Sequence, residues 1–280
     1  MSRPDDWRDL FHGGRRPLVG MVHLAPLPGA PYYEPESMAR AVDRAVHDVE
    51  ALVGAGFDAV LFVNEGDMPY PREVGRETVA GLAAIVAAAR PRGVPFGVEA
   101  LFDPDASLCV AVATGASFVR GSVLGAWEDT SGFRTGGSAS VLRRRAALGA
   151  TDVGVFAVAQ AELAHPLTDL SLSRRLRLAA QERAMDAVLL GALPGRAAEV
   201  GDLEELREAA GGLPVLANSG VKSSTVRDTL SRFDGCLVGS DVKEGGRLAH
   251  PVDPARARRL VDMARATKVG GADESVSPST

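Results

Sequence analysis

The chain has 280 residues with 31 Lys and Arg against 36 Asp and Glu, a formal net charge of −5 at pH 7, and 46% hydrophobic residues. This acidic balance, without a basic stripe, disfavours nucleic acid as a partner, which needs clustered Lys and Arg to replace phosphate counterions. The longest near-apolar stretch, residues 78–89, is shorter than the roughly 20 residues of a spanning helix, and the start lacks the apolar region of a signal peptide. We therefore expect a cytoplasmic protein without a membrane partner.

Eight short apolar or β-branched runs alternate with longer segments that carry apolar residues at helical spacing, which is typical of βα units around a parallel sheet. The predicted strands cover residues 18–23, 59–64, 95–101, 117–123, 152–158, 186–191, 214–218 and 235–240. The predicted helices cover residues 38–53, 73–89, 106–113, 138–147, 171–183, 203–210, 225–232 and 254–266.

Short turn sequences that end a helix and open a strand recur at the spacing of one unit, for example Ala55-Gly56-Phe57-Asp58. This recurrence favours a closed barrel over an open doubly wound sheet. The predicted fold is α/β, a single (β/α)8 TIM barrel over residues 17–268 with a long loop after its fourth strand. Residues 1–16 are predicted to be an N-terminal extension and residues 269–280 a disordered polar tail.

Polar residues at the ends of the first three strands are the catalytic candidates, because chemistry in such barrels collects at the carboxyl ends of the strands. These candidates are His23, then Asn64, Glu65 and Asp67 after the second strand, and Glu99 in the third. A buried carboxylate such as Glu99 needs a partner. A salt bridge to Arg120 on the next strand would satisfy it without any function, and both descriptions can hold for one residue.

Later strand ends supply candidates for binding. The substrate-binding candidates are Arg120, Ser122, Trp127, Asp129 and Asn218, and the phosphate-binding candidates are Ser219, Gly220, Gly239, Ser240 and Lys243. The second group follows the predicted seventh and eighth strands, where barrels often bind phosphate through backbone N–H groups. The loop at residues 124–137 has the length and aromatic content of a lid that could pack on a flat base.

Several of these segments together resemble the BtpA-like (BtpA/SgcQ) family, over about residues 18–263. The segments Gly20-Met21-Val22-His23-Leu24, Asn64-Glu65-Gly66-Asp67 and Val238-Gly239-Ser240-Asp241 carry the resemblance. It implies a TIM barrel of the ribulose-phosphate-binding type and, through the family name, a role in photosystem I accumulation for some members. The chain departs from the family pattern at Glu99, where Asn is usual, and at Gly121-Ser122 and residues 158–162. These departures indicate a specialised substrate or a divergent catalytic step.

We therefore expect an enzyme acting on a phosphorylated sugar or nucleotide-like substrate by N-glycosyl transfer or hydrolysis at the anomeric carbon. One alternative is a sugar-phosphate isomerase, epimerase or lyase. Others are a non-catalytic assembly or stability factor of the photosystem I biogenesis type, and a sensor of a phosphorylated ligand. No cofactor is required and no metal ligands are assigned, although carboxylate oxygens could hold Mg²⁺. Homo-oligomers are an expectation from analogy with other barrels.

Overall fold

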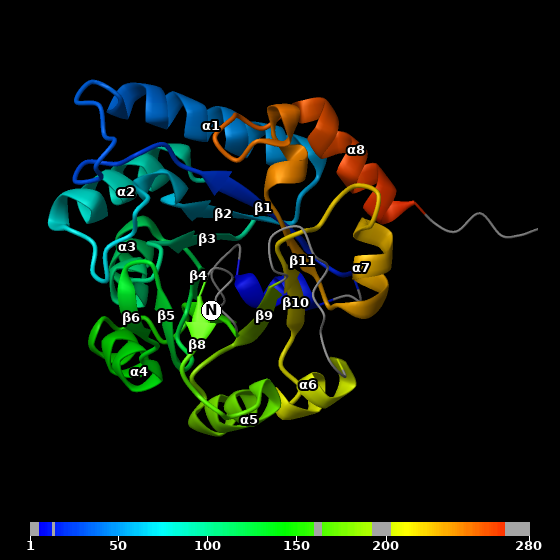
Figure 1. Cartoon of the computed structure of the whole chain (residues 1–280). Coiled ribbons are helices and arrows are strands. Elements are labelled where there is room, and N and C mark those ends of the chain that lie inside the picture. The colour runs from blue at the N-terminus through cyan, green and yellow to red at the C-terminus, as the bar shows by residue number, and fades with distance from the viewer. Residues whose placement is uncertain (1–5, 13–14, 160–163, 192–202, 267–280) are drawn as a thin grey trace, which may run out of the picture.

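A closed barrel of eight parallel strands, in the order β1-β11-β10-β9-β7-β4-β3-β2, forms the centre of the computed structural model, which describes residues 6–12, 15–159, 164–191 and 203–266. Helices α1 to α8 follow one another around it in chain order (Figure 1). The predicted single (β/α)8 barrel is confirmed. The barrel strands are β1 (Leu18–His23), β2 (Ala59–Val63), β3 (Phe96–Glu99), β4 (Phe118–Gly121), β7 (Gly154–Val158), β9 (Ala187–Gly191), β10 (Val215–Asn218) and β11 (Cys236–Val238). The helices are α1 (Met38–Ala55), α2 (Arg76–Ala89), α3 (Pro104–Thr114), α4 (Ser138–Ala147), α5 (Leu172–Glu182), α6 (Leu203–Ala209), α7 (Val226–Arg232) and α8 (Pro254–Arg265).

The strands read as continuous apolar runs because both of their faces are buried, and every residue of β1 and β2 is buried. One face packs against the helices and the other fills the barrel. Leu61 of β2, Phe118 of β4 and Phe156 of β7 belong to the interior cluster, and the last two rings stack with centroids 4.5 Å apart. Because side chains alternate along a strand, residues two positions further on also point inward, at the carboxyl end.

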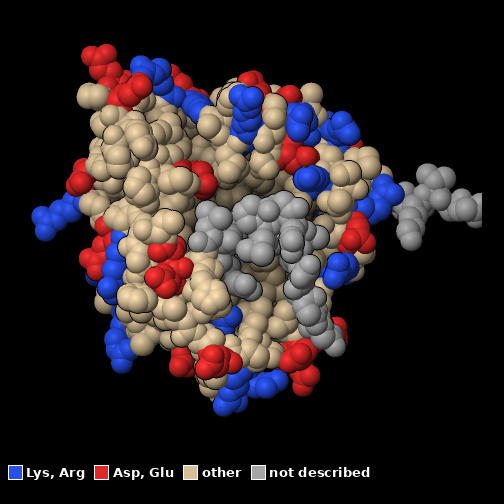
Figure 2. Space-filling view, in the orientation of Figure 1, with Lys and Arg blue, Asp and Glu red and all other residues tan. Residues whose placement is uncertain are grey.

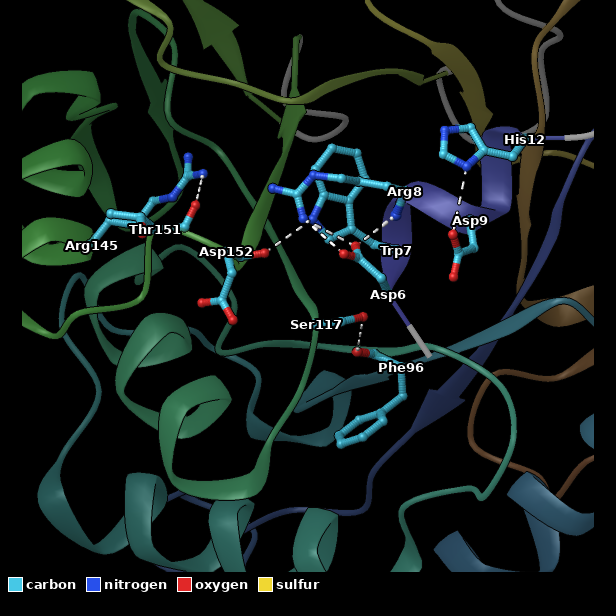
Figure 3. A network of polar contacts seen from close by, with 10 residues as sticks. All are labelled: Asp6, Trp7, Arg8, Asp9, His12, Phe96, Ser117, Arg145, Thr151 and Asp152. Atoms are coloured by element: carbon cyan, nitrogen blue, oxygen red, sulfur yellow. Dashed lines mark hydrogen bonds and ion pairs between the residues drawn. The ribbon is translucent and has the colours of Figure 1, made fainter. Parts of the chain in front are cut away.

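The described part of the predicted N-terminal extension closes the amino end of the barrel. Trp7 and Leu10, from the short 3-10 helix η1 (Trp7–Phe11), belong to the interior cluster. The indole N–H of Trp7 donates to the backbone oxygen of Asp152 at 3.2 Å (Figure 3), and its ring meets Phe156 edge-on at 5.7 Å. A Cβ on Gly154 would lie 2.7 Å from the Trp7 ring. The predicted tail at residues 269–280 lies outside the described residues.

The predicted loop after the fourth barrel strand contains a β-hairpin. Its strands are β5 (Ala126–Asp129) and β6 (Gly132–Thr135), and β8 (His165–Pro166) pairs with the other edge of β5. Arg134 holds the hairpin against the loops after β2 and β3. Its guanidinium donates to the backbone oxygens of Tyr70 at 2.8 Å and Pro71 at 3.1 Å, and it lies 4.1 Å from the centre of the Phe102 ring.

Candidate active site

Four polar side chains point into the barrel at the carboxyl ends of β1, β3, β4 and β10. They are His23, Glu99, Arg120 and Asn218, and each stands two positions after a residue of the inner face of its strand. Their exposed fractions are 5%, 2%, 8% and 1%. Burial of four polar groups beside one another is costly unless they are paired or serve a ligand. The mouth of the barrel is therefore built around this set, which we call the inner ring.

Glu99 and Arg120 form an ion pair across the neighbouring strands β3 and β4. The Nη1 atom of Arg120 lies 2.8 Å from Oε2 of Glu99. Charge-assisted hydrogen bonds of this length are stronger than those between neutral groups. The predicted salt bridge is thus present, at the carboxyl end of the strands, where a ligand in the mouth would also meet it.

His23 stands beside this pair as a neutral imidazole. Burial is the main cause that holds the pKa of His23 well below its usual 6.5, and the positive charges of Lys243 and Arg120 lower it further. Among the described residues its Nδ1 atom has no hydrogen-bond partner. A Cβ on Gly239 would lie 3.0 Å from the ring, so a side chain there would press on the imidazole. The arrangement leaves a buried nitrogen able to accept or donate one proton.

The polar turn after β2 holds neighbouring loops in place. The amide of Asn64 donates to Asp67 at 2.8 Å, and its oxygen accepts the Leu101 N–H at 2.7 Å. The carboxylate of Asp67 also accepts the Leu27 N–H at 2.8 Å. This geometry does not support the prediction that Asn64 and Asp67 act on a substrate, because both side chains are engaged by the loops after β1 and β3. Glu65 is half-buried in the short 3-10 helix η2 (Glu65–Asp67).

The loops after β10 and β11 lie side by side at the mouth. Ser219 and Gly220 have φ values of 73° and 70°, and two consecutive left-handed residues are uncommon when one of them carries a side chain. The carboxylate of Asp241 accepts from the Ser223 backbone N–H at 2.9 Å and its hydroxyl at 2.5 Å, which ties the two loops together. Ser240 is exposed. The two loops that carry the predicted phosphate candidates Ser219, Gly220, Gly239 and Ser240 are therefore adjacent.

The side chain of Lys243 pairs with helix α1, although its backbone N–H donates to the Ser240 oxygen at 3.0 Å. Its ammonium is fully buried and lies 2.6 Å from Oδ2 of Asp48 on α1, while Oδ1 of Asp48 accepts the Val252 N–H. The geometry does not support the prediction that this ammonium binds phosphate. The lysine instead pairs with Asp48 and holds the loop after β11 against α1. Its partner is 195 positions away in the chain, so the local pattern gave no sign of the pairing.

The hairpin places the remaining substrate-binding candidates differently from the prediction. The Asp129 carboxylate accepts from Arg134 within the hairpin, and the Trp127 ring is only 6% exposed, so it offers no open face to a flat base. Trp127 instead lines a small cavity with Ser122 and Arg175. Arg175, on α5, was not among the predicted residues because arginines on helix faces are usually solvated.

The described residues contain no group of three His, Cys, Asp or Glu side chains that could hold a metal ion. None of the helices in the described ranges is long and apolar enough to span a bilayer. Figure 2 shows acidic and basic side chains scattered over the displayed face. Mg²⁺ binding, self-association and partners remain predictions.

Comparisons with known proteins agree with this architecture. The putative sgc region protein SgcQ of Escherichia coli is 31% identical over 259 residues, which cover 91% of this chain and 97% of that protein. The photosystem I biogenesis protein BtpA of Synechocystis sp. is 29% identical, covering 88% of this chain and 87% of that protein. A structure of tryptophan synthase from M. tuberculosis superimposes with a TM-score of 0.58 at 17% identity, covering 90% and 94% of the two chains. The last likeness concerns the fold alone.

The model of the BtpA family matches residues 14–266, which include the whole barrel and every residue of the inner ring. The chain therefore belongs to the BtpA family.

Proposed function

We propose that this protein is an enzyme that binds a phosphorylated small molecule at the mouth of the barrel and transforms it over the inner ring. The observation that carries the proposal is the convergence of His23, Glu99, Arg120 and Asn218 from four strands at the carboxyl end. Buried acid, base and cation in one place are what acid–base chemistry needs. A barrel end with only a structural role could be closed by apolar side chains, which carry no desolvation penalty for buried charges.

The phosphate would bind at the loops after β10 and β11. Backbone N–H groups in left-handed turns form concave sites for anions, and Ser219 and Gly220 supply such a turn. Gly239 leaves room beside His23, and the exposed Ser240 offers a hydroxyl. This position places the phosphate at the rim and the rest of the substrate above the inner ring.

For the reaction itself we favour chemistry at an anomeric carbon. The carboxylate of Glu99, paired with Arg120, would stabilise the positive charge that develops when a glycosidic bond breaks. Asn218 would bind a sugar hydroxyl, and His23 would donate or accept the proton of the leaving group or the nucleophile. Among the predicted carboxylates, Glu99 stands in the inner ring, Asp67 is engaged by the neighbouring loops, and Glu65 follows β2 in a half-buried turn.

The neutral imidazole of His23 supports a second candidate, the isomerase, epimerase or lyase reaction. A neutral imidazole can remove a proton next to a carbonyl, and a guanidinium can stabilise the enolate that forms. His23 and Arg120 both belong to the inner ring, and the charge of Arg120 is one of the causes that lower the pKa of His23.

One experiment separates the two reactions. The protein is incubated in D₂O with nucleoside monophosphates and with ribose 5-phosphate, and proton NMR follows release of free base and exchange of carbon-bound hydrogen. Free base without exchange supports glycosidic chemistry, and exchange without base release supports proton transfer. Glu99→Gln should lower either rate by about 100-fold or more, while the exposed Glu128→Gln on β5 serves as the matched control.

The cyanobacterial relative's name suggests a different class, an assembly factor without turnover. This reading predicts that Glu99→Gln and His23→Gln proteins remain fully active in the assembly assay. A chain that binds no phosphate ester and converts none, while correctly folded, would favour it over the enzyme.

A further inference from the structure

A small, partly open cavity lies beside the mouth, between the hairpin, α5 and the carboxyl ends of β4 and β7. Its volume is about 10 Å³, and its polar lining comes from Ser122 just after β4, Trp127 of β5 and Arg175 of α5. Apolar and backbone surface from Val158 and Ala159 completes one wall. The volume is about that of one water-sized sphere.

The cavity is lined by hydrogen-bond donors that lack acceptors. The indole Nε1 of Trp127 and Nε of Arg175 are buried and have no hydrogen-bond partner among the described residues. Another nitrogen of Arg175, Nη1, donates to the Ala159 backbone oxygen at 3.3 Å. Ser122, only 9% exposed, adds a hydroxyl. Buried donors of this kind are usually satisfied by an ion, a ligand or an ordered water.

The positive charge of Arg175 in the cavity wall indicates that the cavity binds an anion. Within the described residues Arg175 forms no ion pair, and no Asp or Glu of the described part of the chain lines the cavity. Burial lowers the pKa of Arg175, as expected for a guanidinium that lacks a counter-charge. A planar guanidinium beside an indole N–H suits a carboxylate oxygen. A whole phosphate group is larger than this cavity.

The position of the cavity relates it to the phosphate loops. Around the barrel, β9 separates β7 from β10 and β4 lies one strand further away, so the cavity adjoins a different part of the mouth from the loops after β10 and β11. Arg120 on β4 and Asn218 on β10 lie between them in the inner ring. A molecule spanning the mouth would present one end to each site.

We propose that the substrate carries a carboxylate in addition to its phosphate, and that one carboxylate oxygen occupies the cavity lined by Trp127, Arg175 and Ser122. This inference rests on the proposed function and narrows its substrate class to phosphorylated sugar acids and related compounds. Trp127 thereby contributes an N–H donor in place of the stacking platform expected from the sequence.

The test compares 6-phosphogluconate with glucitol 6-phosphate, which differ only in a carboxylate against a hydroxymethyl group, by isothermal titration calorimetry. We expect the carboxylate to tighten binding about tenfold or more. Arg175→Gln should abolish this difference and leave the affinity for glucitol 6-phosphate unchanged. The matched control is Arg174→Gln, because Arg174 is its exposed neighbour on α5 and should retain the difference.

A second arm is independent of phosphate. The sequence has two tryptophans, so a Trp7→Phe protein reports on Trp127 alone. Formate, titrated at constant ionic strength against chloride, should change its emission with saturation, and Arg175→Gln should remove this response. No response to formate, together with equal affinity for the two phosphate esters, would overturn the carboxylate site. A formate response with no advantage of glucitol 6-phosphate over glucitol would instead overturn the proposed phosphate site and support the cavity.

Discussion

The buried ion pair between Lys243 and Asp48 gives a quantitative test of how the loop after β11 is held. In Lys243→Met the Asp48 carboxylate would remain buried beside the Val252 N–H without its counter-ion. Breaking a fully buried pair by removing one partner typically costs about 3–5 kcal/mol. For a domain of this size, each kcal/mol shifts the melting temperature by about 2–4 °C, so we expect a fall of about 6–20 °C.

The assay is urea unfolding combined with scanning calorimetry, on a double-mutant cycle. Asp48→Asn keeps an acceptor for the Val252 N–H. The stability loss of the Asp48→Asn/Lys243→Met protein should therefore be smaller, by about 2 kcal/mol, than the sum of the losses of the two single variants. Lys222→Met, at an exposed lysine in the preceding loop, should change stability by less than about 0.5 kcal/mol. A loss below about 1 kcal/mol for Lys243→Met, without coupling to Asp48, would refute the reasoning.

Two further predictions concern the barrel itself. Because the pKa of His23 is lowered on folding, the unfolded chain binds its proton first, and stability should fall by up to about 1.4 kcal/mol per pH unit as pH drops below about 6.5. Urea unfolding from pH 7.5 to 4.5 should show this slope reduced in His23→Gln and unchanged in His165→Gln, whose imidazole is exposed; equal slopes in all three proteins would contradict it. A Cβ on Gly97 would lie 2.2 Å from the Phe118 ring, so Gly97→Ala should lower the free energy of unfolding by about 1–3 kcal/mol. Gly54 faces open space on α1, so Gly54→Ala should raise the free energy of unfolding by about 0.5–1 kcal/mol. If both variants melted above the wild-type protein, or both below it, the result would contradict this packing argument.

The barrel could be predicted because each strand and helix has a sequence pattern within its own few residues. Apolar runs buried on both faces identify strands, and β1 runs over Leu18–His23 as expected. Helical periodicity gave α4 with the predicted bounds, Ser138–Ala147. The hairpin of β5 and β6 was missed, since its eight residues form short strands with few buried positions and resemble a loop.

The candidate site could be predicted in part. His23, Glu99 and Arg120 could be selected from the sequence because active-site residues of such barrels lie at the carboxyl ends of the strands. The alternation of side chains along each strand then places these three inside the barrel. The roles of Asp67 and Lys243 depend on partners in other loops and helices. Such pairings arise only when distant segments pack, and no local pattern encodes them.

The position of Trp7 has a consequence for how the chain reaches its native state. Its N–H partner, Asp152, is 145 residues further along, so the Trp7 ring can be enclosed only after the residues up to Asp152 have been synthesised. Contacts of such long sequence separation slow folding because the loop entropy is lost before they form. Sealing of the amino end is therefore expected late in folding, after β7 has joined the sheet, and until then the interior aromatic side chains stay open to solvent on that side.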